Sequence, residues 1–244
     1  VTSDNGCPFP RIKGQMYEQD FHLPLVACWT SMLSGGSECD DFIEFCDFAP
    51  TFIEVAGVDV HSGVTGKSFL ELLKGEESHN VRNRAFFGRE KHDAGRPSDV
   101  GYPVRCIRTE QYLYIRNYCP DRWPVGDPET WFGNCDGGPS KEQVLMEFAK
   151  GNAHYFQLCF GRREAEELYD ITKDAECLKN LANVNEFAGV LTDLRKELDD
   201  KLLSTRDPRA LGNGDIFDSY QFVVANKPNG WESYKQGTWT KQEY

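Results

Sequence analysis

Between residues 85 and 118 the hydrophobic pattern of the sequence changes from helical to strand-like, and this change most constrains the fold. Three short runs rich in aromatic and β-branched residues follow one another, at Ala85–Arg89, Val104–Arg108 and Tyr112–Tyr118. Such runs are typical of strands, and short links between successive strands favour antiparallel pairing. A fourth run, Glu167–Ile171, is expected to join them. The sequence therefore predicts a small four-stranded antiparallel sheet.

Helical patterns flank this predicted sheet on both sides in the sequence. The clearest is Asn185–Thr205, where apolar residues recur at helical spacing and form one stripe: Phe187, Leu191, Leu194, Leu198 and Leu202. A stripe of this kind is expected to pack against the sheet. A second helix is predicted up to Ala56, with Asp47 as its N-cap and Gly57 at its C-terminal end. Shorter helices are predicted at Ser68–Lys74 and near Lys141–Lys150.

The order of these elements divides the chain into three parts. Residues 1–80 are expected to be the end of an α/β domain, because the apolar run Leu23–Trp29 is typical of a buried strand. Residues 81–209 are expected to form an α+β subdomain that contains the four-stranded sheet and its packed helix. Residues 210–244 are expected to be an extended tail draped over the body. Because the chain opens in a strand-like run, an N-terminal half of the same protein is expected before it.

The net charge of the chain limits the classes of molecule that it is expected to bind. The formal net charge is −12, which argues against nucleic acid, since neutralising phosphates requires a basic face. One stretch departs from this balance, with these basic side chains: Arg82, Arg84, Arg89, Lys91, His92, Arg96, Arg105 and Arg108. Two interpretations are open, a cationic zone that attracts an anionic substrate and a solvated strand face. No apolar run approaches the roughly 18 residues of a membrane span.

The nine cysteines include no C-x-x-C pair, which argues against a zinc site. Cys28 and Cys106 stand in apolar strand-like runs and are expected to be buried thiols. Disulfides remain open among the four loop cysteines Cys119, Cys135, Cys159 and Cys177. The sequence contains no N-glycosylation sequon, which favours a periplasmic or secreted bacterial protein over a lysosomal eukaryotic one.

A series of short motifs, in order along the chain, resembles the sulfatase family. It begins with Thr2–Gly6 (T-S-D-N-G), Lys13–Glu18 (K-G-Q-M-Y-E) and Leu23–Leu25, and it continues through Asp47–Phe52, Gly66–Leu70, Gly101–Arg105, Pro120–Pro124 and Glu167–Asp170. The series covers residues 1 to about 209. Its Tyr-Pro-x-Arg and Pro-Asp-Arg-Trp-Pro segments are most similar to the heparan N-sulfatase (N-sulfoglucosamine sulfohydrolase)-like branch. The resemblance implies an alkaline-phosphatase-like α/β fold, with the C-terminal part of its large mixed sheet in residues 1–80.

The resemblance also implies a metal site. Asp4 and Asn5 are adjacent hard oxygen donors, which suit Ca²⁺ or Mg²⁺. In the family such residues supply half of the protein ligands to calcium, and an N-terminal strand supplies the others. Taken alone, the same residues are more typical of an Asp-Asn-Gly turn than of a metal site.

The substrate site implied by the resemblance involves four further residues. Lys13 is expected to be catalytic, with its ammonium group against the sulfate, where it would stabilise charge on the sulfate oxygens. His92 is expected to face the substrate near the scissile group, with Asp93 or Arg96 contributing to sugar recognition. The alternative interpretations are a surface turn at Lys13 and a solvent-exposed loop histidine at position 92.

The implied activity is hydrolysis of sulfate esters or sulfamates on a glycan, heparan-like or another sulfated polysaccharide. The family's nucleophile is a formylglycine made from the cysteine of a C-x-P-S-R or C-x-A-S-R motif, and none of the nine cysteines stands in one. The nucleophile is therefore expected on the N-terminal half. Two alternatives remain: a phosphohydrolase of the same superfold, such as a phosphonate monoesterase, and a non-catalytic fragment that binds sulfated glycans through the basic stretch.

Overall fold

The computed structural model describes residues 1–76, 79–80, 82–92, 95–220 and 230–238. The chain divides into two compact units. One unit combines Val1–Ser3 with Pro24–Ala85, and the other combines Asp4–Leu23 with Phe86–Tyr244. The segment of residues 4–23 thus belongs to the same unit as the sheet, although more than 60 residues separate them in the sequence.

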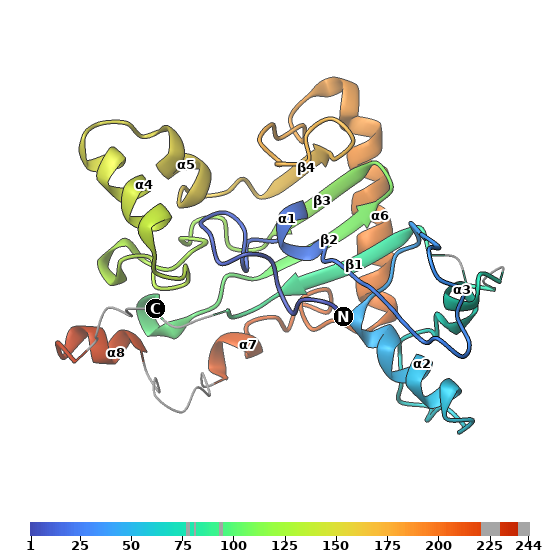
Figure 1. Cartoon of the computed structure of the whole chain (residues 1–244). Helices are drawn as coiled ribbons and strands as arrows, with labels where there is room; N and C mark the ends of the chain where they lie inside the picture. The colour runs from blue at the N-terminus through green and yellow to red at the C-terminus, as the bar shows by residue number, and fades with distance from the viewer. Residues whose placement is uncertain (77–78, 81, 93–94, 221–229, 239–244) are drawn as a thin grey trace. The chain divides into compact units, whose positions relative to one another are not determined.

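A four-stranded sheet forms the centre of the larger unit (Figure 1). Its strands are β1 (Arg84–Arg89), β2 (Val104–Thr109), β3 (Tyr112–Asn117) and β4 (Glu166–Asp170), in the spatial order β1-β2-β3-β4. The pairs β2–β3 and β3–β4 are antiparallel. All four strands lie where the sequence pattern predicts them.

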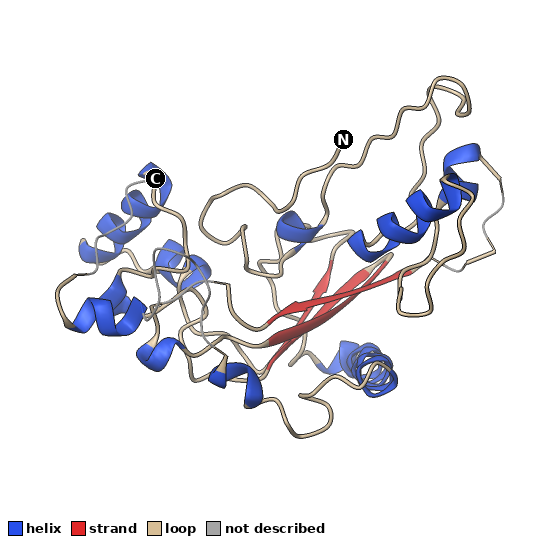
Figure 2. Cartoon of the chain, turned by 90° about the horizontal axis from the view of Figure 1, so that it is seen from below, coloured by secondary structure: helices blue, strands red, loops and turns tan. Residues whose placement is uncertain are grey.

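One face of the sheet is covered by α6 (Ala188–Ser204), which follows a short 3-10 turn at Asn185–Phe187. The helix is seen nearly end-on beneath the sheet in Figure 2. Its buried leucines pack against residues that point to this face, and the cluster consists of Ile107, Tyr114, Leu168, Leu181, Leu191, Leu194, Leu198 and Leu202. The predicted leucine stripe is therefore confirmed as a core contact.

The opposite face of the sheet is covered by residues 4–23, which include α1 (Glu18–Phe21). Met16 and Tyr17 pack on the side chains that alternate to this face: Val104, Cys106, Leu113, Ile115, Tyr169 and Ile171. The Tyr17 hydroxyl donates a hydrogen bond to Glu167 over 3.0 Å. The Arg108 guanidinium donates to both carboxylate oxygens of Glu18, at 2.7 and 2.9 Å. Apolar packing and buried polar contacts thus fix this segment on the sheet.

A third apolar cluster lies beside the sheet, around α4 (Pro139–Ala149) and α5 (His154–Cys159). The cluster is formed by Val125, Phe132, Cys135, Phe156 and Phe160. The Lys141 ammonium group donates to the carbonyls of Phe132 and Cys135, so it ties α4 to the preceding loop. The helix α4 was predicted from the sequence, whereas the six-residue α5 was not.

The described part of the C-terminal tail contains two short helices, α7 (Ile216–Ser219) and α8 (Gly230–Lys235), where the sequence predicts extended chain. Hydrogen bonds hold this tail against the body of the unit, for example from Gly101 N to Asp218 Oδ1 over 2.9 Å. None of the helices among the described residues combines the length and the apolar character that a membrane crossing requires.

In the smaller unit, α2 (Phe48–Val55) and α3 (Leu70–Lys74) confirm two predicted helices. Asp47 stands at the N-cap position of α2, as predicted, but its side chain makes no cap hydrogen bond, because a 3-10 turn at Phe45–Asp47 runs directly into the helix. The Asp47 carboxylate instead accepts from Lys67 N over 2.7 Å and forms a buried ion pair with Arg82 over 2.7 Å. It therefore joins three distant segments of this unit.

The predicted buried strand at Leu23–Trp29 is wrong for the described structure. Its pairing among the described residues is an isolated bridge from Leu25 to Thr2 and two backbone hydrogen bonds between Val26 and Val1, and Val26 is 63% exposed. A buried strand needs hydrogen-bonded neighbours along its length and a covering layer, and the described residues supply only the short contact with Val1 and Thr2. Cys28, predicted to be buried, is exposed for the same reason.

Two predictions about the remaining cysteines can be compared with the structure. Cys106 is fully buried in the sheet, as expected. The loop cysteines Cys119, Cys135, Cys159 and Cys177 carry free thiols. The disulfide alternative is therefore not realised among these four.

The packing of α6 gives the first testable prediction. Leu198 is 1% exposed and Leu203, on the same helix, is 52% exposed. We expect Leu198→Ala to lower the free energy of unfolding by about 2–5 kcal/mol, because it leaves a cavity between helix and sheet. Leu203→Ala carries the same change in helix propensity and should cost no more than about 0.5 kcal/mol. Chemical denaturation of both variants measures the difference, and equal losses would contradict this packing.

Candidate functional site

Two predicted site residues are brought together by the docking of residues 4–23 on the sheet. Gly14 follows Lys13 directly and lies against the imidazole of His92, just beyond the end of β1. A methyl group added at Gly14 would lie 3.1 Å from Cγ and Nδ1 of this ring. Gly14 also has a φ of +72°, a backbone conformation that favours glycine. The structure thus places the backbone beside Lys13 in contact with His92.

The ammonium group of Lys13 lies 2.8 Å from Oδ2 of Asp136. Both side chains keep about a quarter of their surface exposed, at 30% for Lys13 and 26% for Asp136. Sequence reasoning missed Asp136, because it stands in an Asp-Gly-Gly-Pro turn that indicates only a loop before a helix. The pairing depends on the tertiary fold, so no local sequence signal could have found it.

The loop that carries Lys13 is fixed by contacts to its backbone. Asp20 accepts hydrogen bonds from the amides of Gly14 (3.0 Å) and Met16 (3.2 Å). Arg89 donates to the carbonyl of Gly14 and, over 2.7 Å, to that of Pro124. Burial raises the pKa of Asp20, although the hydrogen bonds from the two amides oppose the shift. Burial lowers the pKa of Arg89 to about 10, which leaves it charged at neutral pH.

Asp4 and Asn5, the predicted metal ligands, open this same segment. The Asp4 side chain is exposed, and Asn5 is half-buried and donates from Nδ2 to the carbonyl of Gly6 over 2.8 Å. A carboxylate and an amide carbonyl are oxygen donors that fit Ca²⁺ or Mg²⁺. Among the described residues, no group of three or more His, Cys, Asp and Glu side chains could hold a metal ion. The two residues therefore fit part of a coordination shell, and their assignment stays a prediction.

Arg96 is turned into the protein interior, with 2% of its surface exposed. Its Nε donates to the carbonyl of Trp123 over 2.7 Å, and its Nη2 donates to that of Pro124 over 2.8 Å. Burial lowers its pKa to about 9. These contacts serve the packing of two loops, and a contact between Arg96 and a sugar stays a prediction. Asp93 lies outside the described residues.

Most arginines of the basic stretch from residue 82 to 108 are paired within the protein. Arg82 pairs with Asp47, Arg108 pairs with Glu18, and Arg105 pairs with both Glu90 and Asp207. Together with Arg89 and Arg96, these guanidinium groups bind acceptors inside the protein. For these arginines, the cationic zone and the solvated strand face are therefore both wrong, because their guanidinium groups bind carboxylates and carbonyls within the protein.

Comparison with known proteins supports one family for this chain. Residues 12–131 match the family model described as N-sulphoglucosamine sulphohydrolase, C-terminal. This region contains Lys13, Gly14 and His92, and it ends before Asp136 and the C-terminal tail.

Curated relatives extend the similarity over most of the chain. An ulvan-active sulfatase from Formosa agariphila is 30% identical over 218 residues, which are 87% of this chain and 34% of the relative. The human N-sulphoglucosamine sulphohydrolase is 24% identical over 225 residues, 85% of this chain and 41% of the relative. An N-acetylglucosamine-6-O-sulfatase from Bacteroides thetaiotaomicron is 30% identical over 57% of this chain and 26% of its own length. The chain thus spans well under half the length of these relatives.

Solved structures share the fold at low identity. A Bacteroides fragilis protein assigned to the sulfatases aligns with a TM-score of 0.54 and 18% identity, over 86% of this chain and 36% of its own. A protein solved with its substrate D-glucosamine-2-N,6-O-disulfate aligns with a TM-score of 0.53 and 21% identity, over 79% of this chain and 30% of its own. At these identities the alignments establish the fold alone.

The contact between Gly14 and His92 gives the second prediction. We expect Gly14→Ala to lower the free energy of unfolding by about 1–3 kcal/mol more than Gly212→Ala. Both glycines have positive φ, +72° and +77°, so both substitutions carry backbone strain of about 1 kcal/mol. Only the methyl group at position 14 meets another group, the His92 ring, since nothing lies within 4 Å of one at position 212. Denaturation and the NMR resonances of the His92 imidazole measure the effect. Equal losses with unchanged His92 resonances would contradict the contact.

Proposed function

Because this chain belongs to the sulfatase family, we propose that it supplies the C-terminal part of a glycan sulfatase that hydrolyses sulfate esters or sulfamates. The observation that carries the proposal is the contact between the Lys13–Gly14 loop and His92 within one compact unit. A cation and an imidazole that approach from two distant segments suit an anionic group held between them. The substrate class follows from relatives whose names state action on ulvan and on sulfated glucosamine.

Lys13 is the residue proposed to act on the sulfuryl group. Its ammonium would hold sulfate oxygens and stabilise the charge that develops on the group as the bond to sulfur breaks. Asp136 forms an ion pair with this ammonium group over 2.8 Å. An incoming sulfate would share this partly exposed ammonium with Asp136.

His92 is proposed to bind the substrate next to the scissile group. An imidazole can donate a hydrogen bond to a sulfate or sugar oxygen in either tautomer. The His92 ring packs against the backbone of Gly14, the residue after Lys13. The position of the imidazole is therefore coupled to the position of the Lys13 loop. Asp93 and Arg96 follow His92 in the sequence of the same loop. They are proposed to contribute to recognition of the sugar.

Asp4 and Asn5 are proposed to supply part of a Ca²⁺ or Mg²⁺ site through a carboxylate and an amide oxygen. A divalent cation bound there would withdraw negative charge from sulfate oxygens. The remaining ligands and a formylglycine nucleophile are proposed to come from an N-terminal half of the enzyme.

Large exposed apolar side chains in the smaller unit support packing against that half, among them Val26, Phe52 and Val58. We place the enzyme in the periplasm or outside the cell, or in the lysosome in a eukaryote, where it would meet polymeric substrate.

The role of Lys13 is tested in the active enzyme that contains residues 1–244. We expect Lys13→Ala to lower kcat for a sulfated substrate about 100-fold or more, as for the loss of an oxyanion contact. Lys196→Ala is the matched control, because Lys196 also pairs with an aspartate, Asp200 at 2.6 Å, but on the exposed side of α6. Near-wild-type turnover of the Lys13 variant would refute the role. Faster turnover of a phosphonate ester than of the sulfate ester with the same leaving group would favour the phosphohydrolase alternative.

The metal assignment is tested by a readout other than activity. We expect Ca²⁺ to raise the Tm of this enzyme, because a ligand that binds only the folded state stabilises it. Asp4→Ala should remove most of that increase, whereas Asp59→Ala, which changes an exposed aspartate elsewhere, should leave it intact. An unchanged calcium effect in the Asp4 variant would sink the assignment.

A further inference from the structure

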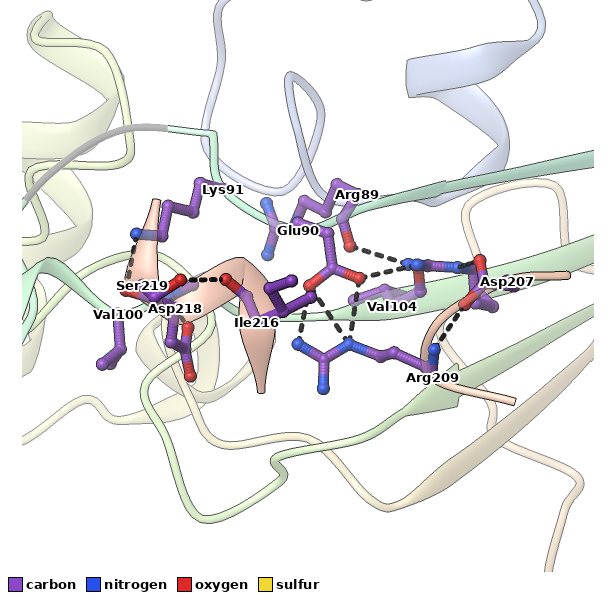
Figure 3. A network of polar contacts seen from close by, with 12 residues as sticks. Arg89, Glu90, Lys91, Val100, Val104, Asp207, Arg209, Ile216, Asp218 and Ser219 are labelled. Atoms are coloured by element: carbon purple, nitrogen blue, oxygen red, sulfur yellow. Dashed lines mark hydrogen bonds and ion pairs between the residues drawn. The ribbon is translucent and has the colours of Figure 1, made fainter. Parts of the chain in front are cut away.

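The loop of residues 90–101 connects β1 to β2 and carries His92. Its ends are joined by one backbone hydrogen bond, from Tyr102 N to Glu90 O over 2.9 Å. In the described sheet β1 has a single neighbouring strand, so pairing with β2 is its only ladder contact. Arg105 of β2 and Arg122 also donate to the base of the loop, to Glu90 and to the carbonyl of Gly101. Further polar contacts there come from the C-terminal residues 207–220, as Figure 3 shows for Arg209 and Glu90.

The first of these contacts joins Arg209 to Glu90, the first residue of the loop. The guanidinium donates from Nε over 2.9 Å to Oε1 and from Nη2 over 2.7 Å to Oε2 of the carboxylate. Glu90 also accepts from Arg105 of β2 over 2.6 Å, and Arg105 in turn donates to Asp207 over 2.9 Å. A bidentate pair in a largely buried position fixes direction as well as distance. Glu90 is therefore held from the sheet and from the tail together.

The second contact centres on Asp218 in α7. Its carboxylate accepts from Gly101 N at the far end of the loop and from Arg122, each over 2.9 Å. Lys91 donates to the carbonyls of Asp218 over 3.3 Å and Tyr220 over 2.7 Å. Burial alone would raise the pKa of Asp218, but the hydrogen bonds from Arg122 and Gly101 outweigh it and hold that pKa below its ordinary value. The carboxylate is thus charged at neutral pH, where it binds Gly101 N at the far end of the loop, while the backbone carbonyl of the same residue binds Lys91 near the start.

A third contact lies farther along the tail. Asp99 accepts from the backbone amide of Trp231 in α8 over 2.9 Å and from Gly95 N over 3.1 Å. The tail therefore meets the loop at its beginning, in its second half and at its end. His92 lies directly after Glu90 and Lys91, two of the residues that the tail binds.

From these contacts we propose that Arg209 and Asp218 are positioning residues of the proposed sulfatase site. They hold residues 90–92 and 99–101 of this loop in the conformation in which the His92 ring packs on Gly14, next to Lys13. The inference rests on the proposed function, because it assigns a catalytic consequence to the position of His92. It goes beyond that function by giving the C-terminal tail a part in the reaction.

The conformational part of the proposal is tested on the chain of residues 1–244. We expect Asp218→Ala to increase hydrogen exchange at residues 95–102 at least 10-fold and to shift the imidazole resonances of His92, with protection in β2 and β3 unchanged. Asp215→Ala is the matched control, because Asp215 is an exposed aspartate one turn earlier in the same tail. Asp218→Asn, which retains an acceptor for Gly101 N, should restore part of the protection. Unchanged exchange in the Asp218→Ala loop would overturn the proposal.

The catalytic part is tested in the active enzyme that contains this chain. We expect Asp218→Ala and Arg209→Met to lower kcat/KM for the sulfated substrate about 10- to 100-fold, as for a misplaced binding group. Asp218→Asn should recover part of the loss, and Asp215→Ala should have no effect.

A His92→Ala variant separates failure of this inference from failure of the proposed function. Loss of activity in His92→Ala together with full activity of both tail variants would overturn the positioning role and leave the proposed function standing. Full activity of His92→Ala would overturn the role proposed for His92, and the positioning role with it.

Discussion

The larger unit depends on one buried carboxylate, that of Glu167 on β4. It accepts hydrogen bonds from Tyr17 (3.0 Å), Tyr169 (2.6 Å) and Asn117 (2.7 Å). A carboxylate withdrawn from water is tolerated only when donors replace its hydration, so each of these donors is needed where it stands. Because one of them is Tyr17, the requirement fixes the segment of residues 4–23 on the sheet. The positions of Lys13, Gly14 and Asp4 follow from that attachment.

The local pattern of apolar residues predicted the secondary structure of the larger unit well, because each strand and helix buries one face. The residues Ile107, Tyr114 and Leu168 alternate with the residues of the opposite face, and the leucines of α6 recur at helical spacing. Prediction from local pattern failed where the burial of a residue depends on segments that are far away in the sequence. The run Leu23–Trp29 has the composition of a buried strand but lacks the neighbours that would bury it. Asp47 has the sequence context of a helix cap, yet its carboxylate binds Lys67 N and Arg82.

In the candidate site, too, local sequence predicted some residues, and others depend on tertiary contacts. Family motifs pointed to Lys13 and His92, and the structure brings their segments together. Asp136, Asp20 and Arg89 act on the Lys13 loop through tertiary contacts that no local spacing encodes. Composition suggested that the arginines of residues 82–108 either attract a substrate or face solvent. A count of charges cannot show that carboxylates and carbonyls from distant segments already bind them.

The sharing of Glu90 between Arg105 and Arg209 has a consequence for how related enzymes can diverge. Arg105 lies within the region that matches the family model, whereas Arg209 lies about 80 residues beyond its end. One of the two guanidinium groups that hold Glu90 therefore lies inside the region of the family model, and the other lies outside it. Substitutions in the segment that carries Arg209 would retune the orientation of the loop in one lineage while every motif residue stayed the same.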